Sequence, residues 1–295
     1  MFNLKKRDLK LQIILAVIFV ILCALVLYPF LLVIGVSLSS EADIIESGYR
    51  VFPLNIDFSA YEYIFNNPEA ILSGFRVTTL FSTITMVLST FLMAMIAYPL
   101  AKKGLRGRKV LSFYIYFTML FSGGLVPTYI LITQYLKLGD SIWVYILPGL
   151  INPWYIFMMR TFFQGIPEEI AESALIDGAS EYTIFFRMIL PLSKPVLATI
   201  ALFVFLMKWN DWYVSMLYIN DEKLISLQYL LQRIMLNIAL LQENMMNGQF
   251  VSLEDIPTET VRMAMAVVVA GPALLVFPFF QKYFVKGLTV GSVKG

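Results

Sequence analysis

Long uncharged stretches recur along the chain, separated by shorter segments that hold most of the charges. A helix needs about 20 predominantly apolar residues to cross the hydrocarbon core of a bilayer, because backbone polar groups cannot stay unpaired there. Stretches of about this length lie at residues 11–38, 77–101, 110–134, 141–160, 195–218 and 262–281. The pattern predicts an all-α membrane protein with six transmembrane helices, organised as a short arm (1–10) and one transmembrane domain (11–295).

The fifth stretch differs from the others because Lys208 and Asp211 interrupt it. A charge at bilayer depth is costly and needs a reason. Residues three apart share one face of a helix, so these two side chains could pair and reduce each other's desolvation cost. The spacing therefore allows an ion pair inside the membrane.

Basic residues indicate which helix ends face the cytoplasm, since cytoplasmic loops retain Lys and Arg. They gather in the arm at 1–10, the connection at 102–109, the segment at 160–194 and the tail at 282–295. Both termini are therefore predicted to be cytoplasmic, with an extracytoplasmic loop at 219–260. A cleaved signal peptide is the competing interpretation of the N-terminus, but the apolar run there far exceeds the roughly 7 to 15 residues of a signal sequence.

The composition supports a membrane protein and limits the chemistry open to it. Hydrophobic residues make up 59% and charged residues 14% of the chain, against roughly 45 to 50% and 25% in soluble domains. The net charge of +2 is too small to attract nucleic acid. The chain has no histidine, the commonest general base and metal ligand, and its single cysteine, Cys23, cannot form an internal disulfide. Neither catalysis nor a bound cofactor or metal is expected.

Two helical segments are predicted outside the spans. In the cytoplasmic loop at 161–194, Pro167 suits a first helical turn, the glutamates after it suit a helix N-terminus, and Gly178 would end or bend the helix. This short amphipathic helix would lie parallel to the membrane, where a cytoplasmic partner could hold it. In the outer loop, apolar residues recur at helical spacing from Leu227 to Leu241. That helix could lie on the bilayer or dock a partner, and both interpretations stay open.

The cytoplasmic loop resembles the EAA loop of ABC importer permeases, whose pattern is E-A-A, three residues, G, nine residues, I, one residue, L-P. The positions concerned are Glu172, Ser173, Ala174, Asp177, Gly178, Leu190 and Pro191. Two departures are visible, because Ser173 replaces the middle alanine and Met188 occupies the isoleucine position. Both replacements are of the same general size class as the residues they replace.

A second resemblance covers nearly the whole chain. The terminal segment 287–295 is similar to the tail of the MalG-like subunit of maltose-type importers. Segments 121–124, 209–212 and 262–264 are typical of the carbohydrate branch, particularly the oligosaccharide-type permeases of Gram-positive bacteria. The chain thus resembles a permease subunit of a carbohydrate ABC importer, which is a multi-pass protein of the bacterial cell membrane.

This resemblance implies a set of partners and a mechanism. A second permease subunit, two ATP-binding ATPase subunits and an extracytoplasmic solute-binding protein would complete the importer. The chain lacks the Gly-x-x-x-x-Gly-Lys-Ser/Thr loop that cradles nucleotide phosphates, so ATP would act through the ATPases. Glu172 would pair with a basic residue of the ATPase, Ala174 would allow close approach, and Gly178 would permit the turn. The tail residues implied to contact the ATPases are Gly291, Lys294 and Gly295.

The solute path is less sharply indicated than the coupling loop. The candidate cavity-lining residues are Lys208, Trp209, Asn210, Asp211, Trp212, Asn152 and Trp154. Aromatic faces together with amide and carboxylate groups suit the binding of sugars. The alternative is an interfacial belt of aromatic residues with Lys208 extending toward the headgroups, and both interpretations stay open.

Two other classes of function compete with the importer permease. A secondary, ion-coupled transporter would need an intramembrane ion site and usually shows inverted repeats. Asp211 is the one acidic residue in the predicted spans that could form such a site, and no repeat is evident. An intramembrane enzyme would need a nucleophile with its base or a metal site, for which this composition offers little.

Overall fold

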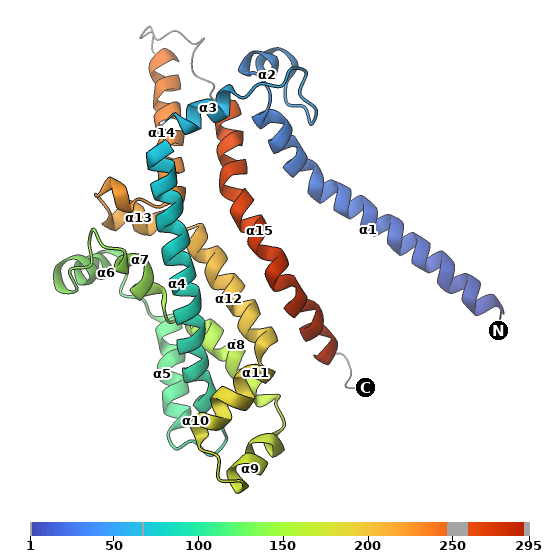
Figure 1. The fold of residues 1–295 in the computed structure, drawn as a ribbon, viewed down its shortest axis with the longest axis vertical. Helices are drawn as coiled ribbons and strands as arrows, with labels where there is room; N and C mark the ends of the chain where they lie inside the picture. Colours follow the sequence, from blue (N-terminus) through green and yellow to red (C-terminus); the bar gives the residue numbers. More distant parts are fainter. Residues whose placement is uncertain (1, 67, 247–258, 292–295) are drawn as a thin grey trace. The chain divides into compact units, whose positions relative to one another are not determined.

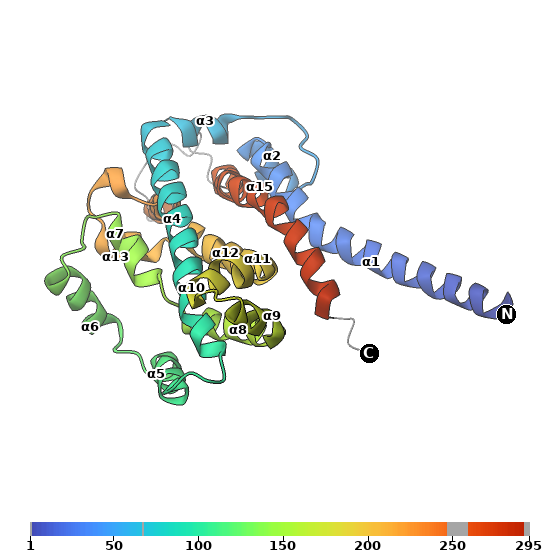
Figure 2. The same cartoon turned by 60° about the horizontal axis from the view of Figure 1, so that its bottom comes forward.

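The computed structural model describes residues 2–66, 68–246 and 259–291, and over these residues it is helical without a β-strand. The chain forms two compact units. Unit 1 comprises residues 1–68 and 234–271, and unit 2 comprises residues 69–233 and 272–295. Figures 1 and 2 show the helices in two views.

Three described helices are long and apolar enough to cross a membrane alone. They are α1 (Phe2–Ser37), α4 (Pro68–Ala101) and α15 (Glu259–Gly291), which match the first, second and sixth expected stretches. Two bent helix pairs raise the number of candidate spans among the described residues to five. The bent pairs overlap the third and fifth expected stretches, and the fourth, 141–160, matches none of the candidate spans among the described residues.

The third expected stretch, 110–134, is bent by 109°. It contains α5 (Arg108–Leu120), α6 (Leu125–Ile130) and the start of a π-helix, η1 (Leu131–Tyr135). Gly124 adopts a φ of +86°, a conformation that is strained for residues with a Cβ. The glycine at this position allows the chain to leave α5 and begin α6 in a new direction.

The fourth and fifth expected stretches are also interrupted. Stretch 141–160 contains α7 (Trp143–Ile146), a 3₁₀ turn at Leu147–Gly149 and most of α8 (Pro153–Gln164). Proline at 153 cannot donate to an upstream carbonyl, so a helix begins there rather than continuing. Stretch 195–218 contains all of α12 (Lys194–Trp209) except its first residue, and all of α13 (Tyr213–Tyr218).

Unit 1 is held by contacts between segments far apart in the sequence. Glu41 begins α2 (Glu41–Ser47), and its carboxylate accepts hydrogen bonds from the backbone N–H groups of Glu259 and Thr260 at 3.0 and 3.1 Å. The Thr260 hydroxyl donates to the same carboxylate at 3.0 Å. A short helix, α3 (Ser59–Phe65), completes this segment. Glu41 thus caps the first turn of α15, where N–H groups lack partners inside the helix.

Unit 2 packs its core around α4. In Figures 1 and 2, α4, α8 and α12 run side by side, and α9 (Glu168–Ile176) lies beyond their ends. Met93, Ala97, Ile156 and Ile200 are buried together in a cluster contributed by these three long helices. The loop that carries α9 is anchored on this cluster.

The amphipathic helix expected from Leu227 to Leu241 is confirmed as α14 (Leu227–Met246), preceded by a 3₁₀ turn at Glu222–Leu224. Its first backbone N–H, on Leu227, donates to the buried hydroxyl of Thr78 on α4 at 2.9 Å. Gly74 lies one turn away on α4, where a Cβ would stand only 3.3 Å from the Leu227 backbone. Close approach of the two backbones fixes the start of α14.

Candidate functional site: the loop at residues 161–194

The predicted short helix in the loop at 161–194 is confirmed as α9. It begins after Pro167, and Glu168 and Glu169 occupy its first turn, where negative charge is favourable. At its other end the Gly178 N–H donates to Leu175 O at 3.0 Å, and the Ala179 N–H donates to Ala174 O at 2.9 Å. These two bonds form a Schellman motif, and Gly178 has the positive φ, +80°, that the motif requires.

The chain after Gly178 turns back toward the spans. Ser180 caps α10 (Glu181–Ile184) by accepting from the Thr183 N–H at 3.2 Å. The helical run continues through a π-helix, η3 (Phe185–Ile189), and α11 (Leu190–Leu192). The run from Glu181 to Leu192 then meets α12 at a bend of 77°. Leu190 and Pro191 therefore lie just before this bend, consistent with proline's missing donor.

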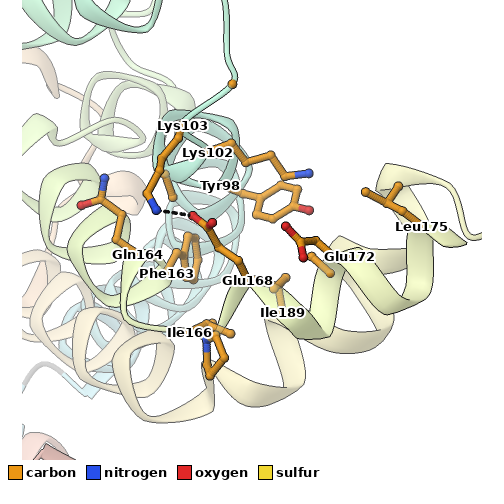
Figure 3. Close-up of a pocket in the computed structure, with 14 residues that line it drawn as sticks. Tyr98, Lys102, Lys103, Phe163, Gln164, Ile166, Glu168, Glu172, Leu175 and Ile189 are labelled. Carbon is orange, nitrogen blue, oxygen red and sulfur yellow. Dashed lines mark ion pairs between the residues drawn. The ribbon is translucent and has the colours of Figure 1, made fainter.

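A pocket of about 220 Å³ lies between α9 and the end of α4. Glu172 and Leu175 line it from α9, and Tyr98, Lys102 and Lys103 line it from the opposite side. In Figure 3, Glu172 points from α9 toward Tyr98. Its side chain is exposed, and its carboxylate forms no ion pair within the described part of the chain.

The two residues after Glu172 have roles inside this chain. The Ser173 hydroxyl donates to the Glu169 carbonyl at 2.6 Å, so its hydrogen is used within α9. Ala174 is only 4% exposed and belongs to the buried cluster of α4, α8 and α12. Its small side chain thus lets α9 approach the chain's own spans, whereas the resemblance assigned the close approach to a partner. Asp177 is the exposed C-cap of α9.

Two ion pairs join the loop to the segment that follows α4. Lys102 pairs with both carboxylate oxygens of Glu181, to which the Tyr98 hydroxyl also donates at 3.0 Å. Lys103 pairs with Glu168 at 2.9 Å (Figure 3). Sequence reasoning did not find these pairs, because the partners stand far apart in the chain and carry no local signal.

The surroundings of Lys102 and Glu181 shift the pKa values of both groups. Burial would lower the pKa of the Lys102 ammonium, but hydrogen bonds with Glu181 and Tyr98 outweigh it, and the pKa is raised. The hydrogen bond from Lys102 holds the pKa of the Glu181 carboxyl below its usual range, against the opposing effect of burial. Both groups are therefore charged across the neutral range.

The candidate cavity residues do not share one environment. Lys208 and Trp209 are 5% and 2% exposed, and the Lys208 ammonium donates to Asp211 at 3.3 Å, which confirms that the two residues pair. Their neighbours Asn210 and Trp212 are exposed. Lys208 also packs on Gly149, where a Cβ would lie 2.5 Å from the Lys208 Cε atom.

The remaining candidates lie elsewhere. Asn152 is the N-cap of α8, and its side-chain oxygen accepts from the Trp154 N–H at 3.0 Å. Trp154 is 61% exposed and lines a surface groove. Gly291 is the last residue of α15, while Lys294 and Gly295 lie outside the described residues.

The chain is similar in sequence to known transport proteins. The family described as "Binding-protein-dependent transport system inner membrane component" matches residues 70–290. Protein LplC of Bacillus subtilis is 39% identical over 273 residues, which cover 92% of this chain and 90% of LplC. The polygalacturonan/rhamnogalacturonan transport system permease protein YtcP of the same organism is 39% identical over 277 residues, 94% of each chain.

A solved structure agrees with these sequence matches. It is a bacterial ABC transporter involved in the import of the acidic polysaccharide alginate, with a TM-score of 0.78 and 30% identity over 94% of this chain and 97% of that chain. None of these matches supports the ion-coupled carrier considered as an alternative. The chain is a multi-pass protein of the bacterial plasma membrane and a transport component rather than an enzyme. Because the family match covers most of the chain and the relatives align over nearly all of it, the chain belongs to the binding-protein-dependent transport system inner membrane components.

Proposed function

We propose that the chain is the permease subunit of an ATP-driven importer for a carbohydrate, specifically an oligosaccharide. The relatives support this class, because their names include polygalacturonan/rhamnogalacturonan and arabinooligosaccharide transport permeases. The arabinooligosaccharide permease AraQ of Bacillus subtilis is 27% identical over 293 residues. A second permease, two ATPase subunits and a solute-binding protein complete the assembly, with six spans in this chain and both termini in the cytoplasm.

The coupling helix in this proposal is α9, which seats in a cleft of an ATPase subunit. The observation that carries it is the division of α9 into two faces. Ala174 is buried against the spans, whereas Glu172 is exposed and Ile176 is 86% exposed. An exposed large apolar side chain beside an unpaired carboxylate is typical of an interaction surface. Glu172 pairs there with a basic residue of the ATPase, and Gly291, Lys294 and Gly295 of the tail provide a second contact.

Alternating access follows from this attachment. Closure of the ATPases on ATP moves α9, and the run from Glu181 to Leu192 conveys the movement to α12 because the two are continuous in the chain. The cavity then opens outward to receive the solute from the binding protein. Asn210, Trp212 and Trp154 are the proposed cavity residues with exposed side chains, while Lys208 and Trp209 support them from within.

The test is the ATPase activity of the complete importer in lipid nanodiscs, with and without the solute-binding protein. Glu172→Lys should abolish the stimulation by the binding protein at unchanged assembly, because like charges would face each other across the ATPase cleft. Glu169→Lys is the matched control, since Glu169 is exposed on the same helix but does not line the pocket. Full stimulation in the Glu172→Lys complex would refute the coupling role.

A further inference from the structure

Two arginines lie on α5 and α8, which are neighbouring helices of unit 2. Arg108 is the first residue of α5, and Arg160 lies in the last turns of α8. The Arg160 Nη1 atom donates to the Ser112 hydroxyl at 3.1 Å. Ser112 stands four residues after Arg108 and therefore on the same face of α5. Both guanidinium groups are positive, so Arg160 brings its charge to the face of α5 that carries the charge of Arg108.

This cationic pair has no acidic partner in the described part of the chain. The ion pairs found there involve Lys102, Lys103, Lys208, Arg233 and Arg262. The Nε atoms of Arg108 and Arg160 are both buried, and neither forms a hydrogen bond within the described residues. Buried donors are normally satisfied, and adjacent like charges oppose each other. Both features call for an anion at this place.

The donors match a phosphate group. A guanidinium presents planar N–H groups that bond two phosphate oxygens at once. The Ser112 hydroxyl, which accepts from Arg160, keeps its own hydrogen for an anion oxygen. Together the three side chains offer several donors to one tetrahedral anion.

The surroundings indicate a phosphate that carries acyl chains. No residue of α5 is buried, and its exposed apolar side chains include Leu111, Phe113 and Tyr116. The Arg160 Cζ atom lies 5.9 Å from the centre of the Phe157 ring. That ring also lines an apolar groove of about 510 Å³ with Trp154, Phe162 and Val196. A soluble phosphate would leave this adjacent apolar surface uncovered, whereas a lipid would cover both.

We propose that Arg108, Ser112 and Arg160 form a binding site for the phosphate of an anionic membrane lipid, whose acyl chain lies along the apolar surface of α5 and α8. Basic pockets between transmembrane helices bind such headgroups in other membrane proteins. The site is separate from the pocket beside Glu172 and does not depend on the coupling role of α9.

The test measures lipid binding to the complete importer rather than transport. The complex is purified in detergent and titrated with phosphatidylglycerol, phosphatidylcholine or inorganic phosphate, and bound lipid is counted by native mass spectrometry. We expect phosphatidylglycerol to bind best. Arg108→Gln and Arg160→Gln should each weaken its binding about fivefold, the effect of one basic residue at a membrane surface. Arg106→Gln is the matched control, since Arg106 is an exposed neighbour in the same connection.

Each other outcome counts against the site. If Arg106→Gln weakens lipid binding equally, the binding depends on general surface charge and not on this site. If an equal concentration of inorganic phosphate displaces the lipid, the site binds a soluble anion. If the glutamine variants bind lipid normally but lose the ATPase subunits, the two arginines contact an acidic protein surface instead of a lipid. If the glutamine variants do not assemble, Arg108→Lys and Arg160→Lys keep the charge but lose the planar fork, and wild-type lipid affinity in both would equally overturn the proposal.

Discussion

The Lys208 ammonium lies 3.3 Å from the Asp211 carboxylate, and only 6% and 15% of the two side chains are exposed. The pair sits at the break between α12 and α13. The second Asp211 oxygen accepts from the Val214 N–H at 3.1 Å, which fixes the start of α13. A buried charge is tolerated when a partner and hydrogen bonds compensate it, so the pair and the helix break stabilise each other.

Removing one member of this pair should be far worse than removing both. Lys208→Met leaves the Asp211 carboxylate buried without its cation, and we expect a loss of about 3 kcal/mol in unfolding free energy. The double variant Lys208→Met/Asp211→Asn keeps an acceptor for Val214 and should recover most of that loss. Thermal unfolding of the purified complex measures both. Equal stability of the single and double variants would contradict the buried pair.

Glu41 should stabilise unit 1 through α15. Glu41→Ala removes three hydrogen bonds and a negative charge from the first turn of that helix. We expect a loss of about 2 kcal/mol, at the upper end of capping effects. Glu46→Ala is the control, since Glu46 is exposed on the same short helix, α2. A similar loss of thermal stability in both variants would show that the cap contributes nothing specific.

Substitutions at two neighbouring positions of α9 should differ strongly in their effect on ATPase stimulation. Ser173→Ala removes a hydroxyl that bonds only its own helix, so stimulation of the ATPase by the binding protein should stay within about twofold of wild type. Ala174→Leu forces a larger side chain into the packed cluster, and the strain of about 1 to 3 kcal/mol should displace α9. Stimulation should then fall at least tenfold. Tolerance of leucine at 174 would mean that α9 does not depend on this packing.

The ion pair between Lys102 and Glu181 predicts a definite pH dependence. The folded pKa of Glu181 is lowered, so its contribution to stability is present above the unfolded pKa and is lost as the pH falls through the folded value. The folded pKa of Lys102 is raised, so its contribution is present below the unfolded pKa and is lost as the pH rises through the folded value. The link between the coupling loop and α4 should hold throughout the neutral range.

Thermal unfolding of wild type and Glu181→Gln across this range checks the prediction. The wild type should be the more stable at pH 7, and the difference should close only in acid, below the ordinary pKa of a glutamate carboxyl, because the folded pKa of Glu181 is lowered. Both side chains are partly exposed, so the difference should also shrink at high salt. A difference that is constant from neutral to acid would mean that Glu181 acts through packing rather than charge.

Features that depend only on residues near each other in the chain could be predicted from the amino-acid sequence. Apolar length predicted α1, α4 and α15, and Pro167 with Gly178 predicted the beginning and end of α9. The pairing of Lys208 with Asp211 also followed from local spacing, because residues three apart meet on one helix face whatever surrounds them.

The faces that these helices bury, and the residues that they contact, depend on how the chain packs in three dimensions. The bend at Gly124 and the cap at Asn152 divide stretches whose apolar content alone reads as continuous helix. Ala174 faces the chain's own spans because the packing of α9 on α4 selects its buried side. The contacts of Glu41 with α15 and of Arg160 with Ser112 join positions far apart in the chain. No short sequence window contains both partners of such a contact, so the folded packing, which brings them within bonding distance, determines the pairing.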